Sequence, residues 1–257
     1  MGTWKLTIAY DGSDFLGWAR QPGLRTVQEE LEDGISRILG GTPVGLAVAG
    51  RTDAGVHALG QVASFSLDHD PPDRFVRRIN AVLPRDVSVL ACEPAPDGFN
   101  ARRWGTSRRY RYRFLTTEHR TPFEEGRALW WPYPLDREAL KACAAAIEGV
   151  HDFTAFTPTQ TKHKRFDRRV LSACWEDECE AVLVFAIEAD AFMRGMIRVL
   201  VGTMMEVGAG KRSLEDFESL LRGAPRERAG ETAPPHGLYF AGVEFGDGPA
   251  FEYPGGS

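Results

Sequence analysis

The sequence predicts an α+β protein with two ferredoxin-like or RRM-like α/β halves that share a mostly antiparallel central sheet. The first observation is the order of its periodic segments, which is strand, helix, strand, strand, helix, strand. The second is a further series of similar plan that begins near Gly105. The third is composition: 257 residues, 43% hydrophobic and 26% charged, are ordinary for a globular chain of one large domain or two small ones.

The elements of the first half follow one another closely. Thr26 and Glu29 have the spacing of a capping box, and an apolar stripe from Val27 to Leu39 indicates the helix that follows. Short apolar or alternating segments indicate strands, and a second helix stops before Pro84. We expect strands at residues 5–10, 45–49, 60–65 and 87–92, and the second helix at residues 74–82.

The second half begins with a strand at residues 109–116 whose faces differ. Aromatic residues and arginines alternate along it, with Tyr110, Tyr112 and Phe114 on one face and Arg109, Arg111 and Arg113 on the other. Asp136 and Ser213 are positioned to cap helices. The other expected elements are helices at residues 137–149, 192–207 and 213–222, and strands at residues 170–175, 181–189 and 238–245. We therefore expect an N-terminal domain of residues 1–104 and a C-terminal domain of residues 105–257.

Several classes of protein are not expected. No apolar run approaches the roughly 20 residues of a membrane helix. The N-terminus enters a strand pattern without an apolar signal segment, so we expect a cytoplasmic protein. The four cysteines lack the paired spacing of a metal site, and the six histidines show no ligand pattern, so no metal is expected.

The charge distribution indicates an RNA-binding surface although the net charge is −5. One basic cluster alone is as often a solvated face, but two on an acidic chain favour a track for phosphates. The stretch of residues 157–169, which holds the second cluster, is either an RNA-clasping insertion or a flexible loop. The first cluster is Arg102, Arg103, Arg108, Arg109, Arg111 and Arg113, and the second is Lys162, Lys164, Arg165, Arg168 and Arg169.

Residues 50–57, with the sequence GRTDAGVH, form a short polar loop between two apolar strands. Gly50 and Gly55 allow backbone conformations that larger residues avoid, which indicates a tight turn. The loop presents Arg51 and Asp53 from a rigid sheet, as functional residues often are. A surface ion pair of little energetic value is the alternative for these two side chains.

The longer string around this loop, AGRTDAGVHALGQVASF, resembles the signature of the tRNA pseudouridine synthase A family. Further segments resemble the same family in the same order along the chain. They are IAYDGSDFLGW at residues 8–18, TVQE at 26–29, RRYRY at 108–112, FMRGMIR at 192–198, VGTMMEVG at 201–208 and GLYF at 237–240. The sequence departs from the family pattern at Ala19, Gly195 and Val199, none of which has a proposed chemical role.

The resemblance implies an enzyme that isomerises uridine to pseudouridine without a cofactor. Asp53 is then the nucleophile, and attack on C6 of the base and on C1′ of the ribose are both open. A carboxylate in a water-poor pocket needs a cationic partner to stay ionised. The resemblance assigns that role to Arg198 and RNA binding to Arg51. It assigns uracil stacking and proton transfer to Tyr110, while His57 is a weaker candidate for a general base.

The resemblance also implies the partners of the enzyme. The substrate is tRNA, the target uridines are positions 38 to 40 of the anticodon stem-loop, and the enzyme is a homodimer with a catalytic cleft between its two halves. A uridine in folded tRNA is stacked or paired, so it must be extruded before reaction. Phosphate contacts are expected from Arg102, Arg103, Lys162, Lys164 and Arg165.

Two other classes of function remain open from the residues. A non-catalytic RNA-binding module needs aromatic residues on an open sheet face and does not need Asp53. A glycoside hydrolase normally needs two acidic residues, and the loop of Asp53 contains no second one. Release of tritium from C5-labelled uridine in tRNA distinguishes the three, because only the isomerase exchanges that hydrogen.

Overall fold

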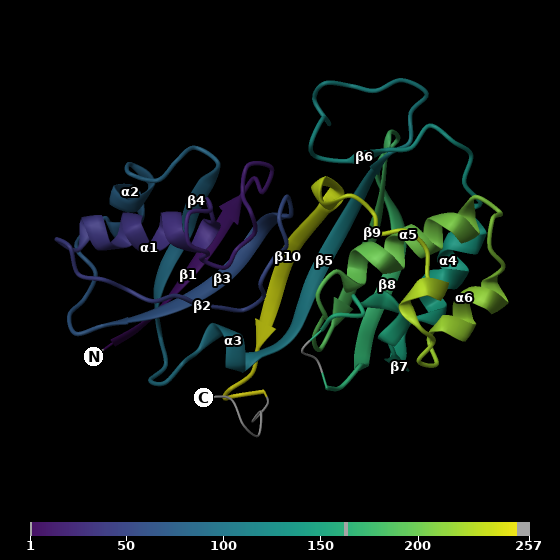
Figure 1. Cartoon of the computed structure of the whole chain (residues 1–257). Coiled ribbons are helices and arrows are strands. Elements are labelled where there is room, and N and C mark those ends of the chain that lie inside the picture. The colour runs from purple at the N-terminus through teal and green to yellow at the C-terminus, as the bar shows by residue number, and fades with distance from the viewer. Residues whose placement is uncertain (1, 162–163, 251–257) are drawn as a thin grey trace. The chain divides into compact units, whose positions relative to one another are not determined.

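The computed structural model describes residues 2–161 and 164–250, and the chain forms two compact units (Figure 1). Unit 1 comprises Met1–Arg108 and Tyr239–Ser257, and unit 2 comprises Arg109–Leu238. The sequence predicts a single boundary between residues 104 and 105. The observed division falls a few residues later, and the last strand returns to unit 1, where it pairs with a strand of that unit.

Unit 1 has the βαββαβ order of a ferredoxin-like fold. Its strands are ordered β4-β1-β3, and both β2 and β10 pair with β3. β10 is parallel to β3, with Tyr239 opposite His57. The elements are β1 (Gly2–Tyr10), α1 (Val27–Ile38), β2 (Ala47–Val48), β3 (His57–Leu67), α2 (Phe75–Asn80), β4 (Val87–Ala95), α3 (Ala101–Trp104) and β10 (Leu238–Phe245).

The core of unit 1 lies between its sheet and its two longer helices, α1 and α2, which Figure 1 shows on one side of the strands. The apolar stripe of α1 is buried as its spacing predicts, at Val27, Leu31 and Ile35. Gly34 lets α1 approach α2 closely, because a Cβ atom there would lie 3.1 Å from Ile79 Cδ1. Burial of each such aliphatic side chain stabilises the fold by about 1.5–3 kcal/mol.

The predicted capping box at the start of α1 is wrong. Thr26 is the N-cap residue, but its buried hydroxyl makes no capping hydrogen bond. The Glu29 carboxylate is drawn away by an ion pair with Arg20, whose Nη2 lies 3.4 Å from Glu29 Oε1. The helix therefore begins where the sequence predicts, but its stability comes from the buried stripe and not from reciprocal capping.

Unit 2 repeats part of the same plan. Its strands are ordered β5-β9-β8-β7, and the short β6 pairs with β5. β8 and β9 form the antiparallel pair that the sequence predicts. The elements are β5 (Gly105–Leu115), β6 (Leu129–Trp130), α4 (Arg137–Ala146), β7 (Gly149–Asp152), η1 (Thr154–Phe156), β8 (Asp167–Cys179), β9 (Val182–Ala189), α5 (Met196–Gly208), α6 (Leu214–Leu220), η2 (Arg226–Arg228) and η3 (Pro235–Gly237).

The helices of unit 2 begin at identifiable caps. Asp136 accepts a hydrogen bond from Ala139 N at 3.0 Å, and Ser213 caps α6 in the same way, as predicted. α5 begins at Met196 and not at residue 192. The reason is Gly195, whose φ of 68° is left-handed and interrupts a right-handed helix.

Candidate active site

The loop that carries Asp53 is held by hydrogen bonds on both sides of that residue. Before it, the buried Thr52 accepts a hydrogen bond through its carbonyl from Trp18 N at 3.1 Å. After it, Gly55 N donates to Phe15 O at 3.2 Å. Asp53 itself is partly exposed. Its carboxylate therefore stands on a backbone whose position is set from both directions.

The turn at residues 11–17 packs so closely against this loop that two of its positions need glycine. A Cβ atom at Gly12 would lie 2.0 Å from Val56 O, and one at Gly17 would lie 2.9 Å from Thr52 O. Gly17 also has a φ of 92°, which other residues rarely adopt. The close backbone contact explains why the glycines of IAYDGSDFLGW accompany the GRTDAGVH loop.

Two buried side chains, Tyr10 of β1 and Gln61 of β3, also bind the loop. The hydroxyl oxygen of Tyr10 lies 2.8 Å from Thr52 Oγ1, and Gln61 Nε2 donates to Gly50 O at 2.7 Å. Burial raises the pKa of Tyr10 to about 12, although hydrogen bonds with Thr52 and Gln61 offset part of that rise. The hydroxyl therefore stays protonated at neutral pH and supports the loop as a neutral group.

His57 is a packing residue of unit 1, which disfavours the general-base assignment. Its side chain is buried, and its ring stacks on Tyr239 with a centroid separation of 4.6 Å. Nδ1 accepts a hydrogen bond from Gly12 N at 3.0 Å and lies 3.2 Å from Asp11 Oδ1. Because Nδ1 accepts from a backbone N–H, the neutral ring carries its proton on Nε2.

Three of the arginines predicted to bind RNA are exposed on unit 1: Arg51 in the loop, and Arg102 and Arg103 on α3. The sequence pattern did not predict α3. Its one local signal is the N-cap residue Asn100, whose Oδ1 accepts hydrogen bonds from the backbone N of both Arg102 and Arg103. Arg108, from the same cluster, is engaged inside unit 1 and donates to the backbone carbonyls of Ala49, Gly105 and Arg102.

Tyr110, the candidate for base stacking, and Tyr112, which shares its face of β5, have different surroundings in unit 2. Tyr112 is 0% exposed, and its hydroxyl donates to Pro234 O at 2.7 Å. Tyr110 is 7% exposed, and its ring meets Phe192 edge-on with a centroid separation of 5.0 Å. The alternation predicted for β5 is confirmed. The Tyr112 ring is fully buried and its hydroxyl makes a structural hydrogen bond, so Tyr112 is a poor candidate for contact with a base.

Arg198 lies in the first turn of α5 and is partly exposed. Its Nε donates to Ala233 O at 2.7 Å, and Ala233 N donates to Arg198 O at 3.0 Å. Burial raises the pKa of Tyr112, and the positive charge of Arg198 opposes this rise, so the two side chains interact electrostatically. Ala233 was not predicted as a partner of Arg198, because nothing in an alanine 35 residues away signals a hydrogen bond.

The basic clusters are less uniform than their sequences suggest. Arg111 pairs with Glu176 at 3.1 Å. Arg113 pairs with Glu124 and Glu178, each at 2.7 Å, so acids from other segments pair with two of the three arginines on β5's basic face. In the second cluster Lys164 and Arg165 are exposed, and Lys162 lies outside the described residues.

The structure thus places Asp53, Arg51, Arg102 and Arg103 in unit 1, and Tyr110, Arg198, Lys164 and Arg165 in unit 2. Within residues 2–161 and 164–250, no group of three or more His, Cys, Asp or Glu side chains is arranged to hold a metal ion. Over the same residues, no helix is long and apolar enough to cross a membrane.

Comparison with known proteins gives a consistent result. A family model described as tRNA pseudouridine synthase matches residues 6–102 and 143–246. A tRNA pseudouridine synthase A from Myxococcus xanthus is 40% identical, and the match covers 98% of this chain and 96% of that protein. Proteins of the same name from Halalkalibacterium halodurans and Frankia casuarinae are 40% and 42% identical over 91% and 94% of this chain, and 89% and 88% of their own lengths.

Proposed function

This chain belongs to the tRNA pseudouridine synthase family, and from this premise we propose that Asp53 is its catalytic nucleophile. As a member of that family it is an isomerase that converts uridine to pseudouridine in tRNA. The observation that carries the proposal is the fixed backbone around Asp53, whose neighbour Thr52 is bound through its carbonyl to Trp18 and through its hydroxyl to Tyr10. Such preorganisation is what a nucleophile needs to meet a reacting carbon repeatedly.

The reaction balances without any redox step. The N1–C1′ bond of uridine breaks, the uracil turns, and a C5–C1′ bond forms while the C5 hydrogen leaves as a proton and N1 takes one up. The Asp53 carboxylate forms a transient bond either to C6 of the base or to C1′ of the ribose, and that bond breaks when the product is released. Beyond these bond changes only protons are transferred, so a nucleophile and acid–base groups, which side chains can supply, are sufficient for the reaction.

The roles of two unit 2 residues belong to the same proposal. Arg198 keeps Asp53 ionised, since a carboxylate in a water-poor site otherwise takes up a proton. Tyr110 stacks on the extruded uracil and moves the C5 proton through its hydroxyl. Both tyrosines are buried, and the residual exposure of Tyr110, 7% against 0% for Tyr112, supports this choice between the two.

The substrate contacts follow from charge and exposure. The proposed targets are uridines 38 to 40 of the anticodon stem-loop of tRNA. The proposed enzyme is a cytoplasmic homodimer. The target base leaves its stack, and cations hold the neighbouring phosphates meanwhile. The proposed phosphate contacts on unit 1 are Arg51, Arg102 and Arg103, and those on unit 2 are Lys164 and Arg165; all five are exposed. Lys162, which lies outside the described residues, is a sixth proposed contact.

The test is Asp53→Asn, measured for pseudouridine formation and for tRNA affinity in parallel. We expect binding to survive and turnover to fall below about a thousandth of the wild-type rate, because a neutral amide cannot replace a nucleophilic carboxylate. Asp14→Asn is the matched control, since Asp14 is an exposed acid in the neighbouring turn. A faster Asp53→Asn variant removes Asp53 from the nucleophile's role.

The same preparation distinguishes the alternative functions. An isomerase releases tritium from C5-labelled uridine in tRNA and keeps the base attached to the chain. A glycoside hydrolase liberates free uracil, and a binding module does neither. Wild-type protein that binds tRNA without releasing tritium contradicts the isomerase function itself.

A further inference from the structure

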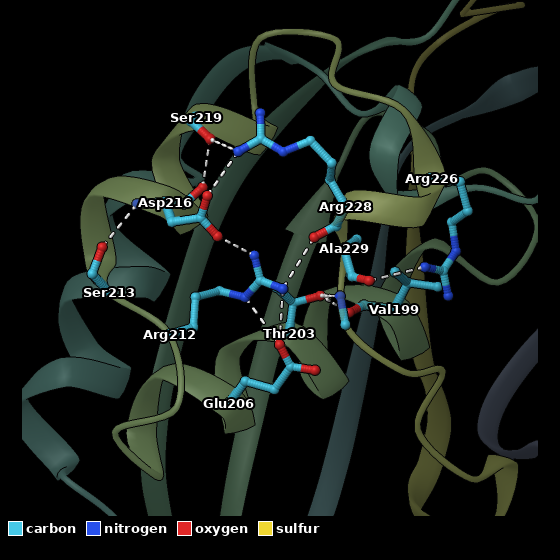
Figure 2. Close-up of polar contacts among 11 residues, drawn as sticks. Val199, Thr203, Glu206, Arg212, Ser213, Asp216, Ser219, Arg226, Arg228 and Ala229 are labelled. Atoms are coloured by element: carbon cyan, nitrogen blue, oxygen red, sulfur yellow. Dashed lines mark hydrogen bonds and ion pairs between the residues drawn. The ribbon is translucent and has the colours of Figure 1, made fainter.

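The segment between α6 and η3, residues 226–233 and here called the strap, runs along α5 and ends at Arg198. Figure 2 shows its first half beside the helix. The strap backbone there is bound by the side chains of Thr203 on α5 and of Arg212 in the loop that follows α5. Arg198, Gly202 and Glu206 are spaced four residues apart, so they share one face of α5. The strap contacts this face at each of the three levels.

The level nearest to Arg198 depends on a glycine. Ala233 exchanges two hydrogen bonds with Arg198, one of them with the guanidinium Nε at 2.7 Å. One turn along, a Cβ atom at Gly202 would lie 1.9 Å from Glu231 O, so no other residue admits the strap at this distance. The carbonyl that orients the guanidinium group therefore comes from a strap in direct contact with the helix backbone.

A single buried hydroxyl ties the middle of the strap to α5. Thr203 is fully buried, and its Oγ1 donates to Val199 O at 2.7 Å and accepts from Gly230 N at 3.0 Å. The hydroxyl uses both its donor and an acceptor position (Figure 2). Without it, the Gly230 N–H is left buried without that partner.

The far end of the strap is held by an arginine network that Figure 2 shows in full. Arg212 Nη2 donates to Arg228 O at 3.0 Å, while its Nε donates to Glu206 Oε2 at 2.9 Å. Arg212 also pairs with Asp216, which in turn accepts from Arg228 Nη2 at 2.7 Å. The Arg212 side chain at the centre of this network is only 14% exposed, whereas Asp216 and Arg228 are 41% and 51% exposed.

We propose that the strap positions Arg198 for catalysis, with Gly202, Thr203 and Arg212 as positioning residues. A helix alone leaves an arginine side chain free to choose among rotamers. Here the hydrogen bond from Nε to Ala233 O restricts that choice, and the place of the carbonyl is set by the strap's attachments. The Tyr112 hydroxyl bond to Pro234 O holds the residue that follows. This inference rests on the proposed role of Arg198.

The test uses Thr203→Val, which keeps the side-chain shape and removes the hydroxyl, with Thr203→Ser as the conservative rescue. We expect Thr203→Val to lower kcat by roughly ten- to a hundredfold, the scale of a small misplacement of a catalytic group, with tRNA affinity unchanged. Thr203→Ser should restore the rate. Should Thr203→Val not fold, Arg212→Gln takes its place, with Arg212→Lys as its rescue.

The decisive measurement repeats Thr203→Val in the Arg198→Met background. If the strap acts through Arg198, the second change lowers kcat by less than about twofold there. An equal loss in both backgrounds means a general structural effect and overturns the inference, as does an Arg198→Met variant with a wild-type rate. Asp53→Asn separates this outcome from failure of the proposed function, because the nucleophile assignment stands or falls on that variant alone.

Discussion

Two tyrosines on one face of β5 have different surroundings in unit 2. The Tyr112 hydroxyl is bonded to Pro234 O inside unit 2, where the ring is fully buried. Tyr110 packs edge-on against Phe192 and keeps a small exposed fraction. Removing the two hydroxyls should therefore affect different properties of the protein.

We predict that Tyr110→Phe binds tRNA normally but forms pseudouridine slowly, because the ring still stacks and the proton shuttle is lost. Tyr112→Phe should lower the free energy of unfolding by about 1–3 kcal/mol, since a buried carbonyl loses its donor. Its rate should fall less than that of Tyr110→Phe. Urea unfolding and single-turnover rates of both variants measure this. If Tyr112→Phe is the slower enzyme, the assignment must shift by two residues along β5.

At the scale of elements, β5 and α3 carry arginines with different availability. Arg111 and Arg113 of β5 face acids of β8 and of the loop before β6, so a phosphate must compete with those carboxylates. Arg102 and Arg103 of α3 are exposed, and within the described residues no ion pair neutralises either side chain. A surface arginine that is already paired with a carboxylate gains less from binding a phosphate than an arginine without such a pair.

We predict that Arg102→Gln with Arg103→Gln weakens tRNA binding and flattens the slope of log K against log salt by roughly 1–2 units, as loss of two phosphate contacts requires. The matched control is Arg111→Gln with Arg113→Gln, which should change the slope by less because their charges are already paired. Fluorescence titrations at several salt concentrations give both slopes. Equal changes in the two pairs contradict a separate role for α3.

At the scale of the whole molecule, stability depends on pH through buried tyrosines. Burial raises the pKa of Tyr10 to about 12, above its ordinary value near 10. Folding therefore favours the protonated hydroxyl. The stabilisation is fully present below about pH 10 and is lost as the pH rises towards 12, at about 1.4 kcal/mol for each unit of pKa difference. Tyr112 acts in the same direction, since burial raises its pKa as well.

We predict that Tyr10→Phe flattens the fall of unfolding free energy between pH 10 and 12. The comparison uses slopes and not absolute values, because the variant also loses its hydrogen bond to Thr52. Tyr133→Phe is the control, since Tyr133 is 66% exposed and should leave the slope unchanged. Urea midpoints at intervals of half a pH unit test this, and a wild-type slope in Tyr10→Phe would remove Tyr10 from the linkage.

Local patterns alone determine much of this protein. The order of elements, the alternation along β5, the caps at Asp136 and Ser213 and the loop at residues 50–57 follow from periodicities and turn residues that involve near neighbours. The family itself is carried by short motifs of the same kind. Even so, a local pattern failed where a distant partner competed, as Arg20 does for the Glu29 of the expected capping box.

Only the tertiary structure decides which of these groups are already engaged. Tyr112 meets Pro234 across 122 residues, Arg111 meets Glu176 across 65, and Arg198 meets Ala233 across 35. The pairing of β10 with β3 in unit 1 is also a contact between segments distant in sequence. Each of these contacts depends on strand register and on how a distant segment packs. The residues involved carry no trace of it in their own neighbourhood, because a backbone carbonyl or a surface carboxylate looks the same in sequence whether or not it has a partner.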